Sequence, residues 1–389
     1  MLQQFRKDFS RQAALQGVLI AIVGYASSVA IVVQGLKAMG ATSAEIASGL
    51  LFLGIGKGIV AIGLSLWTRM PISIAWTSPG MALLAVTPAV AGGFPAAIGA
   101  FIIVAVLIML TALWSPLGRL IEAIPKPIAN AMLAGIIFKF CLAPFIALKQ
   151  MPVIAAIILL TWIIMLKLNR FYAVPAAVVV AVGAISLGDG FDPGAVSLVP
   201  SVSFIMPVFT LEAMISLAIP LFIVTMASQN IAGLAVLKTF DFNPRPRDGL
   251  LATGAFSLIT APFGAPAINF AAITAALSAG PDAHADRDRR YVAAVIAGVG
   301  YIVLAALAGI STALVVNSSP LLIEAVAGLA LIGAFASATS GALQGEDDRI
   351  PAMATFLVTA SGLSLFGIGP AFWGLVIGWG LYGFLRWKP

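Results

Sequence analysis

The sequence predicts an all-α polytopic membrane protein. Three observations carry this prediction: the composition, the lengths of the apolar runs and the placement of the basic residues. Of the 389 residues, 61% are apolar and only 9% are charged, with a mean hydropathy of +1.08. A soluble domain has about 25% charged residues and could not bury this much apolar surface. Most of the chain is therefore expected to lie in lipid.

Fourteen apolar runs follow one another along the chain, seven in each half. Several of them are shorter than the roughly 20 residues that a helix needs to cross a bilayer, among them 71–88, 248–263 and 266–280. The runs are 14–39, 43–67, 71–88, 92–113, 123–147, 151–169 and 172–188, then 208–237, 248–263, 266–280, 290–316, 319–344, 350–367 and 370–386.

The basic residues set the orientation. With the N-terminus in the cytoplasm and fourteen spans, 17 of the 21 Lys and Arg residues fall on the inner side. Lys37 and Lys149 fall outside, and Lys57 and Lys139 lie within spans. This asymmetry follows the positive-inside rule and places both termini in the cytoplasm. The net charge of +6 is thus explained by membrane topology, and no nucleic-acid partner is expected. The first apolar run is expected to be a span rather than a cleaved signal peptide.

The two halves carry traces of an internal repeat. Pro127 is followed by Gly135 as Pro320 is followed by Gly328, at an offset of 193 residues; Pro175 and Pro370 match at an offset of 195. Because seven is odd, a duplicated seven-span unit must insert in the opposite orientation. The sequence therefore predicts two inverted repeats, as in many secondary transporters.

The third and tenth segments are predicted to be broken. Pro71–Ser78 (PISIAWTS) matches Pro262–Asn269 (PFGAPAIN) at an offset of 191, and each is followed by a helix of small residues. Ser78 and Asn269 are expected to be N-caps, with Pro79 at the first helical position. A half-helix that starts inside the membrane leaves unpaired N–H groups there, which suit an anion.

Several longer strings resemble the benzoate:proton symporter (BenE) family of bacterial inner-membrane carriers. They are TMASQNIAGLAVL (225–237), APFGAPAINFAAITAAL (261–277), AHADRDRRY (283–291), AGLAL (327–331), TFLVTASG (355–362) and GIGPAFWGLVIG (367–378). The resemblance runs from PISIAWTSPG to the last span. It implies a fold similar to that of nucleobase and sulfate-type anion transporters, with fourteen segments and with segments 3 and 10 each built from a short strand and a half-helix.

The resemblance also implies a division into a core (transport) domain and a gate domain. The core would comprise 12–115 and 208–316, and the gate 116–190 and 318–387. The expected activity is import of benzoate or a related aromatic carboxylate by proton symport, with elevator-like movement of the core and no cofactor beyond the proton gradient. A homodimer through the gate domain is left open.

Other functions remain as alternatives. The chain could be an exchanger or uniporter for another organic or inorganic anion, or a nucleobase-like carrier, on the same fold. Nucleobase carriers of similar fold place acidic residues in segments 8 and 10, whereas Ser228, Gln229, Asn230 and Asn269 stand there in this chain. The absent carboxylates favour an anionic substrate. No HExxH, GxSxG or metal-ligand spacing supports an enzyme.

The predicted substrate-binding residues flank the two breaks and line segments 1 and 8. They are Trp76, Thr77, Ser78, Pro79, Gly80, Asn269, Phe270, Tyr25, Ser28, Gln229 and Asn230.

Each of these residues also has a structural interpretation. Ser78 and Asn269 could be plain caps, and Trp76 and Phe270 could pack in the core instead of sandwiching an aryl ring. Tyr25 and Ser28 share a helix face and could line the cavity or bond between helices. Gln229 and Asn230 could line the site or form a buried polar network.

Two charged residues are candidates for charge compensation or proton coupling. Lys57 lies within a span, in GIGKG, and could neutralise the substrate or gate its passage. Ionisable residues inside a membrane are functional candidates by default. Glu45 lies near a span end and could carry the proton, or could simply be solvated.

Overall fold

A computed structural model describes residues 2–114, 116–117, 119, 124–187, 200–316, 319–366 and 368–387. Within these ranges, seven helices or continuous helical segments are long and apolar enough to cross a membrane. A further pair, Arg287–Ala305 and Ala308–Val316, passes the same test together but is bent by 61°. The protein is therefore a multi-pass, mostly helical membrane protein. These helices do not by themselves establish fourteen segments in two inverted repeats, which remain a prediction.

The first half of the described chain contains nine helices and one strand: α1 (Leu2–Asp8), α2 (Arg11–Ala26), α3 (Val29–Ala38), α4 (Ser43–Thr68), β1 (Ile74–Trp76), α5 (Ser78–Val86), α6 (Gly93–Leu113), α8 (Lys126–Gln150), α9 (Pro152–Asn169) and α10 (Ala173–Leu187). The 3₁₀ turn η1 (Arg170–Tyr172) joins α9 to α10.

The second half continues with α11 (Leu211–Ala213), the π-helix η3 (Met214–Ala218), α12 (Ile219–Thr225), the π-helix η4 (Met226–Ile231), α13 (Ala232–Thr239), α14 (Pro246–Thr260), the 3₁₀ turn η5 (Ala261–Phe263), β2 (Ile268–Phe270), α15 (Ile273–Ala279), the 3₁₀ turn η6 (Arg287–Arg289), α16 (Tyr291–Ala305), α17 (Ala308–Val316), α18 (Pro320–Ala342), α19 (Arg349–Ser361) and α20 (Pro370–Arg386).

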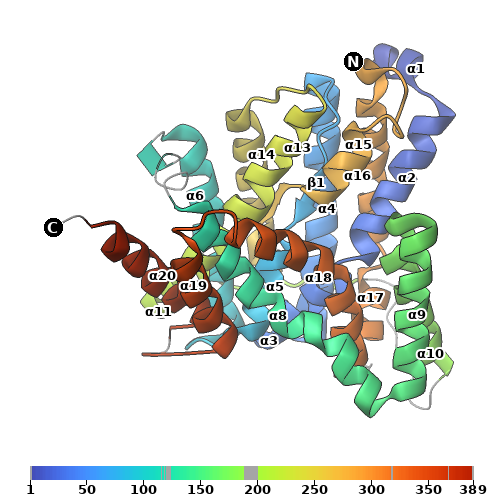
Figure 1. Ribbon diagram of the computed structural model, residues 1–389. Coiled ribbons are helices and arrows are strands. Elements are labelled where there is room, and N and C mark those ends of the chain that lie inside the picture. Colours follow the sequence, from blue (N-terminus) through green and yellow to red (C-terminus); the bar gives the residue numbers. More distant parts are fainter. Residues whose placement is uncertain are drawn as a thin grey trace.

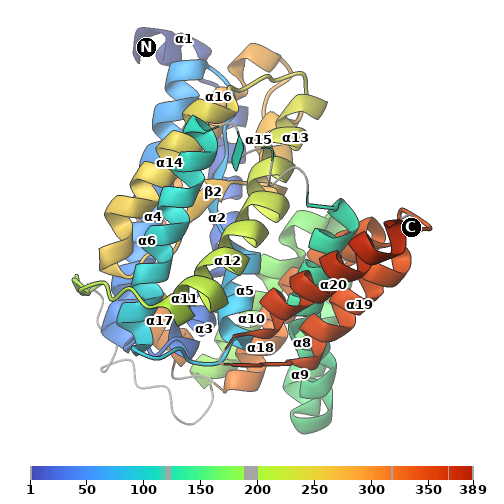
Figure 2. The ribbon, with the colours of Figure 1, turned by 90° about the vertical axis from the view of Figure 1, so that its left-hand side faces the viewer.

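The helices form two groups that lie side by side. α2, α4, α6, α14 and α16 stand together on one side, and α8, α9, α10, α18, α19 and α20 gather on the other (Figures 1 and 2). The predicted core and gate domains divide the chain in a similar way, but three of their predicted boundaries, at residues 115, 190 and 318, fall outside the described residues. The domain division therefore remains a prediction.

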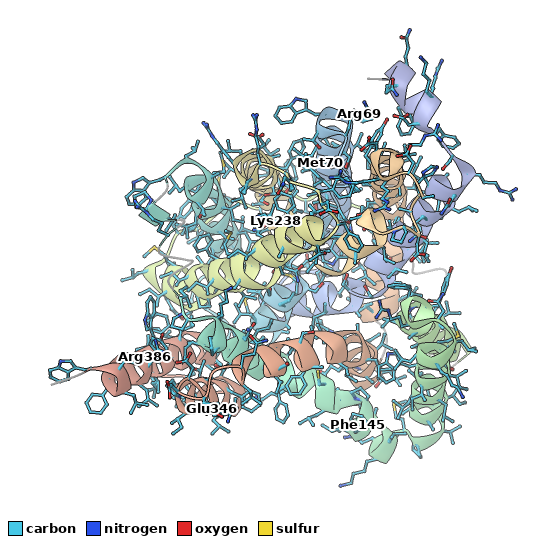
Figure 3. All side chains as sticks on the ribbon, turned by 45° about the horizontal axis from the view of Figure 1, so that its top comes forward. Arg69, Met70, Phe145, Lys238, Glu346 and Arg386 are labelled. Atoms are coloured by element: carbon cyan, nitrogen blue, oxygen red, sulfur yellow. The ribbon has the colours of Figure 1, made fainter. Side chains whose placement is uncertain are left out.

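The helices of the second group expose apolar side chains. The outward residues of α9 include Val153, Leu160, Ile164 and Leu168, all more than half exposed. In Figure 3 Phe145 projects outward from α8, on the side of the molecule away from Arg69. A soluble protein would not expose such a surface, but lipid covers it without cost.

Two short strands meet at the centre of the first group. β1 and β2 pair antiparallel, with Ala75 opposite Asn269 in the middle of the register. The strands begin 194 residues apart, at Ile74 and Ile268. The sequence alignment at an offset of 191 is thus wrong by three residues, because Pro262 belongs to the turn η5 and not to an extended segment. The corrected offset agrees with the values of 193 and 195 found elsewhere in the chain.

The caps of the two short helices also differ from the prediction. Thr77, and not Ser78, is the N-cap of α5, and its Oγ1 accepts a hydrogen bond from Gly80 N at 3.2 Å. Asn269 lies inside β2, and α15 starts after Ala272 with no side-chain cap. Thr77 is the one residue between β1 and α5, so its side chain takes the capping position there. The residue before α15 is Ala272, whose methyl group cannot accept a hydrogen bond.

Close packing of α4 against α16 explains the glycines of GIGKG. A Cβ placed on Gly58 would lie 2.6 Å from the carbonyl oxygen of Gly298, so only glycine allows the two helices to approach this closely. Small residues at such crossings are typical of helix pairs in membranes. The approach brings Lys57, between Gly56 and Gly58, into the protein interior.

Candidate functional site

A cavity of about 950 Å³, including the part that opens to solvent, lies between the two helix groups. Its two walls differ in chemistry. The wall on the side of α2, α4 and the strands carries polar side chains, namely Ser27, Ser28, Lys57, Ser78, Gln229 and Thr274. The opposite wall, from η1, α10 and α18, is mostly apolar: Phe171, Val174, Pro175, Ala330, Leu331 and Ala334. Arg170 of η1, which is exposed, also lines the cavity. The cavity thus suits a molecule with one polar and one apolar end.

Lys57 is the buried charge of this cavity. Its side chain is only 1% exposed. The ammonium Nζ lies 3.6 Å from the ring centroid of Trp76 and 3.6 Å from that of Tyr301. Both contacts are within the range of cation–π attraction. Among the described residues no Asp or Glu forms an ion pair with Lys57.

A hydrogen bond and an aromatic contact hold the ring of Trp76 in place. Its Nε1–H donates to Ser28 Oγ at 2.7 Å, and Ser28 Oγ donates to Gly24 O at 2.8 Å. Tyr25 packs edge-on against the Trp76 ring with the centroids 5.6 Å apart, and its hydroxyl donates to Ser311 Oγ at 2.9 Å. Trp76 and Ser28 therefore line the cavity, whereas Tyr25 supports Trp76 and borders a separate, apolar cavity.

The start of α5 borders the cavity through Ser78 and Pro79. Thr77 lies beneath them, fully buried, and its Oγ1 accepts a second hydrogen bond from Thr225 at 3.0 Å. Gly80 is also buried and does not reach the cavity lining. Of the predicted residues at this break, Trp76, Ser78 and Pro79 can thus meet a ligand, while Thr77 and Gly80 shape the helix start.

The predicted residues of the second break support the strands instead. In the amide orientation that satisfies both of its polar atoms, Asn269 Oδ1 accepts from Thr77 N at 3.0 Å and Nδ2 donates to Phe270 O at 2.9 Å. Asn230 Oδ1 accepts from Phe270 N at 3.0 Å. Phe270 borders a different cavity, near Leu64 and Gly249. The structure therefore does not bring Phe270 and Trp76 together around one ligand position.

Gln229 and Asn230 lie in the π-helix η4 and, as consecutive residues of one helix, point to different places. Gln229 lines the cavity, and Asn230 is fully buried against β2. A π-helix adds a residue to the turn and is frequent at functional sites. The sequence left open whether this amide pair lines the site or forms a buried polar network. Gln229 lines the cavity, and Asn230 belongs to a buried network.

Glu45 lies away from the cavity, at the start of α4. Its Oε2 accepts from Thr42 N at 2.8 Å and from Thr42 Oγ1 at 2.7 Å, which completes a capping box. Such a box satisfies helix N–H groups and needs no further role.

The sequence did not identify Tyr301 or the apolar wall of the cavity. Tyr301 lies in the apolar run GVGYIV, where nothing distinguishes it from a core residue. Its position depends on Gly24, since a Cβ there would lie 2.6 Å from the Tyr301 hydroxyl. Pro175 and Leu331 stood in strings noted for the repeat and the family resemblance, but those strings gave no indication of a cavity. Within the described ranges, no three His, Cys, Asp or Glu residues are grouped closely enough to hold a metal ion.

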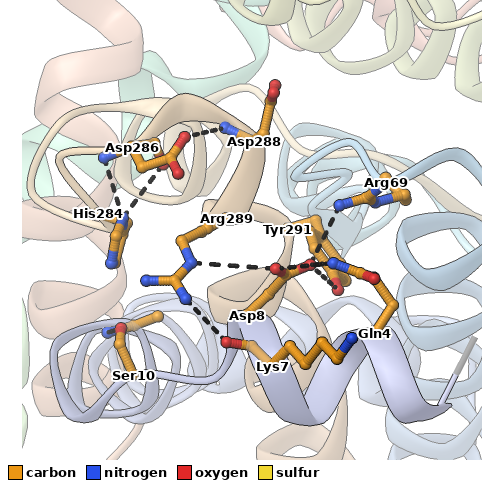
Figure 4. A network of polar contacts seen from close by, with 11 residues as sticks. Gln4, Lys7, Asp8, Ser10, Arg69, His284, Asp286, Asp288, Arg289 and Tyr291 are labelled. Atoms are coloured by element: carbon orange, nitrogen blue, oxygen red, sulfur yellow. Dashed lines mark hydrogen bonds and ion pairs between the residues drawn. The ribbon is translucent and has the colours of Figure 1, made fainter.

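A polar network at one end of the molecule ties the N-terminal helix α1 to the end of α4 and to the start of α16 (Figure 4). Asp8 accepts hydrogen bonds from Arg69 at 3.1 Å and from Tyr291 at 2.9 Å, and Arg289 lies 3.9 Å from it. Burial opposes ionisation of Asp8, but the hydrogen bonds from Tyr291 and Gln4 and the charge of Arg69 outweigh it, so the pKa of Asp8 is lowered.

Comparison with solved structures identifies the class of fold. The transmembrane domain of a cyanobacterial bicarbonate transporter, BicA, matches 93% of this chain and 97% of its own length, with a TM-score of 0.58 and 16% identity. The murine anion transporter Slc26a9 in its inward-facing state matches 97% of this chain and 68% of its own length, with a TM-score of 0.60 and 13% identity. The fold is that of membrane anion transporters.

The sequence comparisons then give the family. Residues 7–384 match the family model of the benzoate membrane transport protein, BenE. The chain is 32% identical to the benzoate membrane transport protein of Acinetobacter baylyi, over all of this chain and 98% of that protein. It is 39% identical to the inner membrane protein YdcO of Escherichia coli, over 94% of this chain and 93% of that protein. The chain belongs to the BenE family and is a membrane transporter, not an enzyme.

Proposed function

We propose that the protein is a secondary active transporter that imports benzoate, or a closely related aromatic carboxylate, together with a proton. The observation that carries the proposal is the division of the cavity into a polar wall with a buried ammonium and an apolar wall. Benzoate has the same division, with a carboxylate at one end and a ring at the other. The family of the chain and the name of its Acinetobacter baylyi relative point to the same substrate.

The polar wall offers two groups to a carboxylate. The first is the Lys57 ammonium, which no described carboxylate neutralises. The second is the start of α5, where Ser78 lies at the positive end of the helix dipole. The aromatic ring would then lie against Phe171, Val174 and Pro175 of the other wall. An aryl ring gains roughly 25 cal/mol for each Å² of apolar surface that it buries there.

The proposed architecture has fourteen segments in two inverted repeats. The antiparallel pairing of Ala75 with Asn269 supports it, since these residues are also 194 apart in the sequence and would lie on the axis that relates the repeats. The cavity lies between the proposed core and gate domains, so elevator-like movement of the core against the gate would carry the substrate with Lys57 and α5. Transport would need no cofactor, only the proton gradient.

Uptake by the purified protein in lipid vesicles tests the function. The initial rate of labelled benzoate entry, under an inward proton gradient, should exceed the rate in vesicles without protein, which measures passive entry of benzoic acid. A protonophore should abolish the excess. If the protein adds nothing to the passive rate, or if its contribution ignores the gradient, the proposal is wrong.

Competition by two analogues tests separately whether the carboxylate and the ring of benzoate are needed. Benzamide keeps the ring and lacks the charge, and acetate keeps the charge and lacks the ring. We expect neither to compete at concentrations where benzoate does, because each leaves one wall of the cavity unmatched. Competition by acetate as strong as by benzoate would indicate a general anion carrier.

An exchanger or uniporter for another anion is the second candidate. The shared fold with BicA and Slc26a9, which are named as bicarbonate and anion transporters, favours it. Bicarbonate and chloride would then drive counterflow of a labelled anion without a proton gradient. For the benzoate symporter we expect counterflow only with aromatic carboxylates.

The proposed location is the bacterial inner membrane, with both termini in the cytoplasm. The name of the Escherichia coli relative and the distribution of basic residues support it. A homodimer through the gate domain stays a prediction, which the mass of the protein in detergent, measured by light scattering, would test. Labelling of single cysteines in intact cells would test the orientation.

A further inference from the structure

Lys57 is buried in the protein and also borders a cavity. It lies near the middle of the 26-residue helix α4, and its side chain is buried. It also borders a cavity that a ligand can enter. A buried charge without a partner costs free energy, so such residues are kept where the charge is used.

The two rings around Lys57 hold it without neutralising it. The indole of Trp76 and the phenol of Tyr301 each present a face to Nζ, and Ser28 fixes the indole. Aromatic faces attract an ammonium but carry no net charge. With no opposite charge beside it in the empty site, the amine can give up its proton to water. A carboxylate that enters the cavity would supply the opposite charge and favour the ammonium again.

Few other described groups near Lys57 can exchange a proton. The cavity lining also includes the phenol of Tyr301 and the guanidinium of Arg170. An arginine keeps its proton throughout. A phenol that carried the proton would have to stand as a buried, unpaired phenolate in the empty site, whereas an amine without its proton is neutral. Tyr25 lies behind Trp76 and outside this lining.

The charged groups of the elements packed against α4 lie at the ends of those elements. They include Lys37 in the last turn of α3, Asp248 in the first turn of α14 and the arginines around η6 before α16. None of them faces Nζ, and Glu45 and Arg69 stand at the two ends of α4 itself. Lys57 is therefore the group of the described cavity that can take up a proton on one side of the membrane and release it on the other.

We propose that Lys57 carries the coupled proton, so that the substrate binds as an ion pair of the Lys57 ammonium and the carboxylate. One proton adds to the neutral amine of Lys57, one carboxylate binds beside it, and the buried site gains no net charge. On the other side the carboxylate leaves and the amine returns its proton to water. Each ligand favours the other, and this coupling is reciprocal. The inference rests on the proposed function and adds the residue that links the two fluxes.

The first test uses the unmodified protein in detergent. The heat of benzoate binding, measured in two buffers of different ionisation enthalpy, gives the protons taken up with each benzoate. We expect about one proton per benzoate over the pH range in which the empty site is unprotonated, and a Kd that rises about tenfold per pH unit there. Benzoate binding with no proton uptake at any pH between 6 and 9 would overturn the proposal.

The second test fixes the charge. Lys57→Arg should bind benzoate without proton uptake and with a Kd that no longer depends on pH, because arginine does not release its proton. It should exchange labelled for unlabelled benzoate across vesicles but lose the stimulation by an inward proton gradient. Lys57→Gln should lose affinity at every pH. The matched control is Lys139→Arg, at a lysine in the apolar helix α8 outside the cavity, which should behave as the unmodified protein does.

The outcomes separate the two proposals. If the unmodified protein transports no benzoate, the proposed function fails. If it transports benzoate and Lys57→Arg still shows proton uptake and gradient stimulation, the function stands and the role of Lys57 is wrong. Should Lys57→Arg not fold, the proton count on the unmodified protein still decides.

Discussion

The two strand–helix units of this protein have the same order of elements, a short strand and then a short helix, but they make different contacts. We call Ile74–Val86 the first unit and Ile268–Ala279 the second unit. The first unit presents Trp76 and Ser78 to the cavity, and its nine-residue helix is capped by Thr77. The second unit presents mainly small residues and has an uncapped seven-residue helix. Its own polar residue Asn269 faces back to the first unit. The first unit borders the cavity with its polar and aromatic side chains, and the second unit supports it.

The backbone of the two strands shows the same difference. In β2, Phe270 N donates to Asn230 Oδ1 and Ile268 N donates to Ser257 Oγ at 2.9 Å, so side chains from η4 and α14 fix this strand. The structure thus fixes the second unit by buried polar side chains, whereas the first unit places Trp76 and Ser78 on the cavity.

The largest expected effect is on the second unit. Asn230→Ala removes the acceptor of Phe270 N and leaves a buried N–H group unpaired, which costs about 1–3 kcal/mol. We expect a clear fall in melting temperature in detergent. The matched control is Gln229→Ala, one residue away on the cavity side, which should keep the melting temperature and weaken benzoate binding. Equal melting temperatures for the two variants would contradict this assignment of roles.

The next effect concerns the cap of the first unit. Thr77→Ala removes the side-chain acceptor of Gly80 N, and losing such a cap costs about 1 kcal/mol. Thr77→Ser should keep most of the stability. Thermal unfolding monitored by tryptophan fluorescence would measure both. Ser78→Ala should leave stability unchanged, and a loss as large as that of Thr77→Ala would restore Ser78 as the cap.

A smaller effect is expected from the indole hydrogen bond. Trp76→Phe keeps an aromatic face toward Lys57 but loses the Nε1–H donor to Ser28, a bond worth about 0.5–1.5 kcal/mol. Benzoate affinity, measured by calorimetry, should fall by a factor of about 2–10. Phe270→Leu, at the corresponding position of the second unit, should change stability and leave affinity as it is. A fall in affinity for Phe270→Leu would place that ring at the ligand after all.

The smallest effect lies outside both units, in the network that joins α1 to the end of α4 and the start of α16 (Figure 4). The pKa of Asp8 is lowered in the fold, so its contribution to stability is present above the unfolded value of about 3.9 and is lost as pH falls through the folded value. Because Arg69 and Arg289 are partly exposed, Asp8→Asn should cost only roughly 0–1 kcal/mol at neutral pH. Melting curves of the two proteins should converge below about pH 4. A gap that persists at low pH would show that the charge of Asp8 is not what stabilises the network.

Local patterns in the sequence predicted much of this protein. Composition and hydropathy predicted a polytopic helical protein, since only lipid can cover so much apolar surface. Proline and serine in PISIAWTSPG predicted an extended segment before a short helix, and the structure has β1 and α5 at that place. The specific strings gave the family, which the comparisons confirm. Lys57 stood out because a charge inside a span is rare.

What the tertiary structure decided is which residues meet. No local signal could tell that Tyr301 lies opposite Trp76 across Lys57, because the three come from separate elements brought together by the packing of α4 against α16. Asn269 lies inside β2 and accepts from Thr77 N, so it caps no helix; of the two adjacent amides, Gln229 lines the cavity and Asn230 is buried. The apolar wall comes from the other helix group. The sequence determined what each segment is, since that depends on its own residues, whereas the cavity depends on contacts between distant segments that a single sequence does not show.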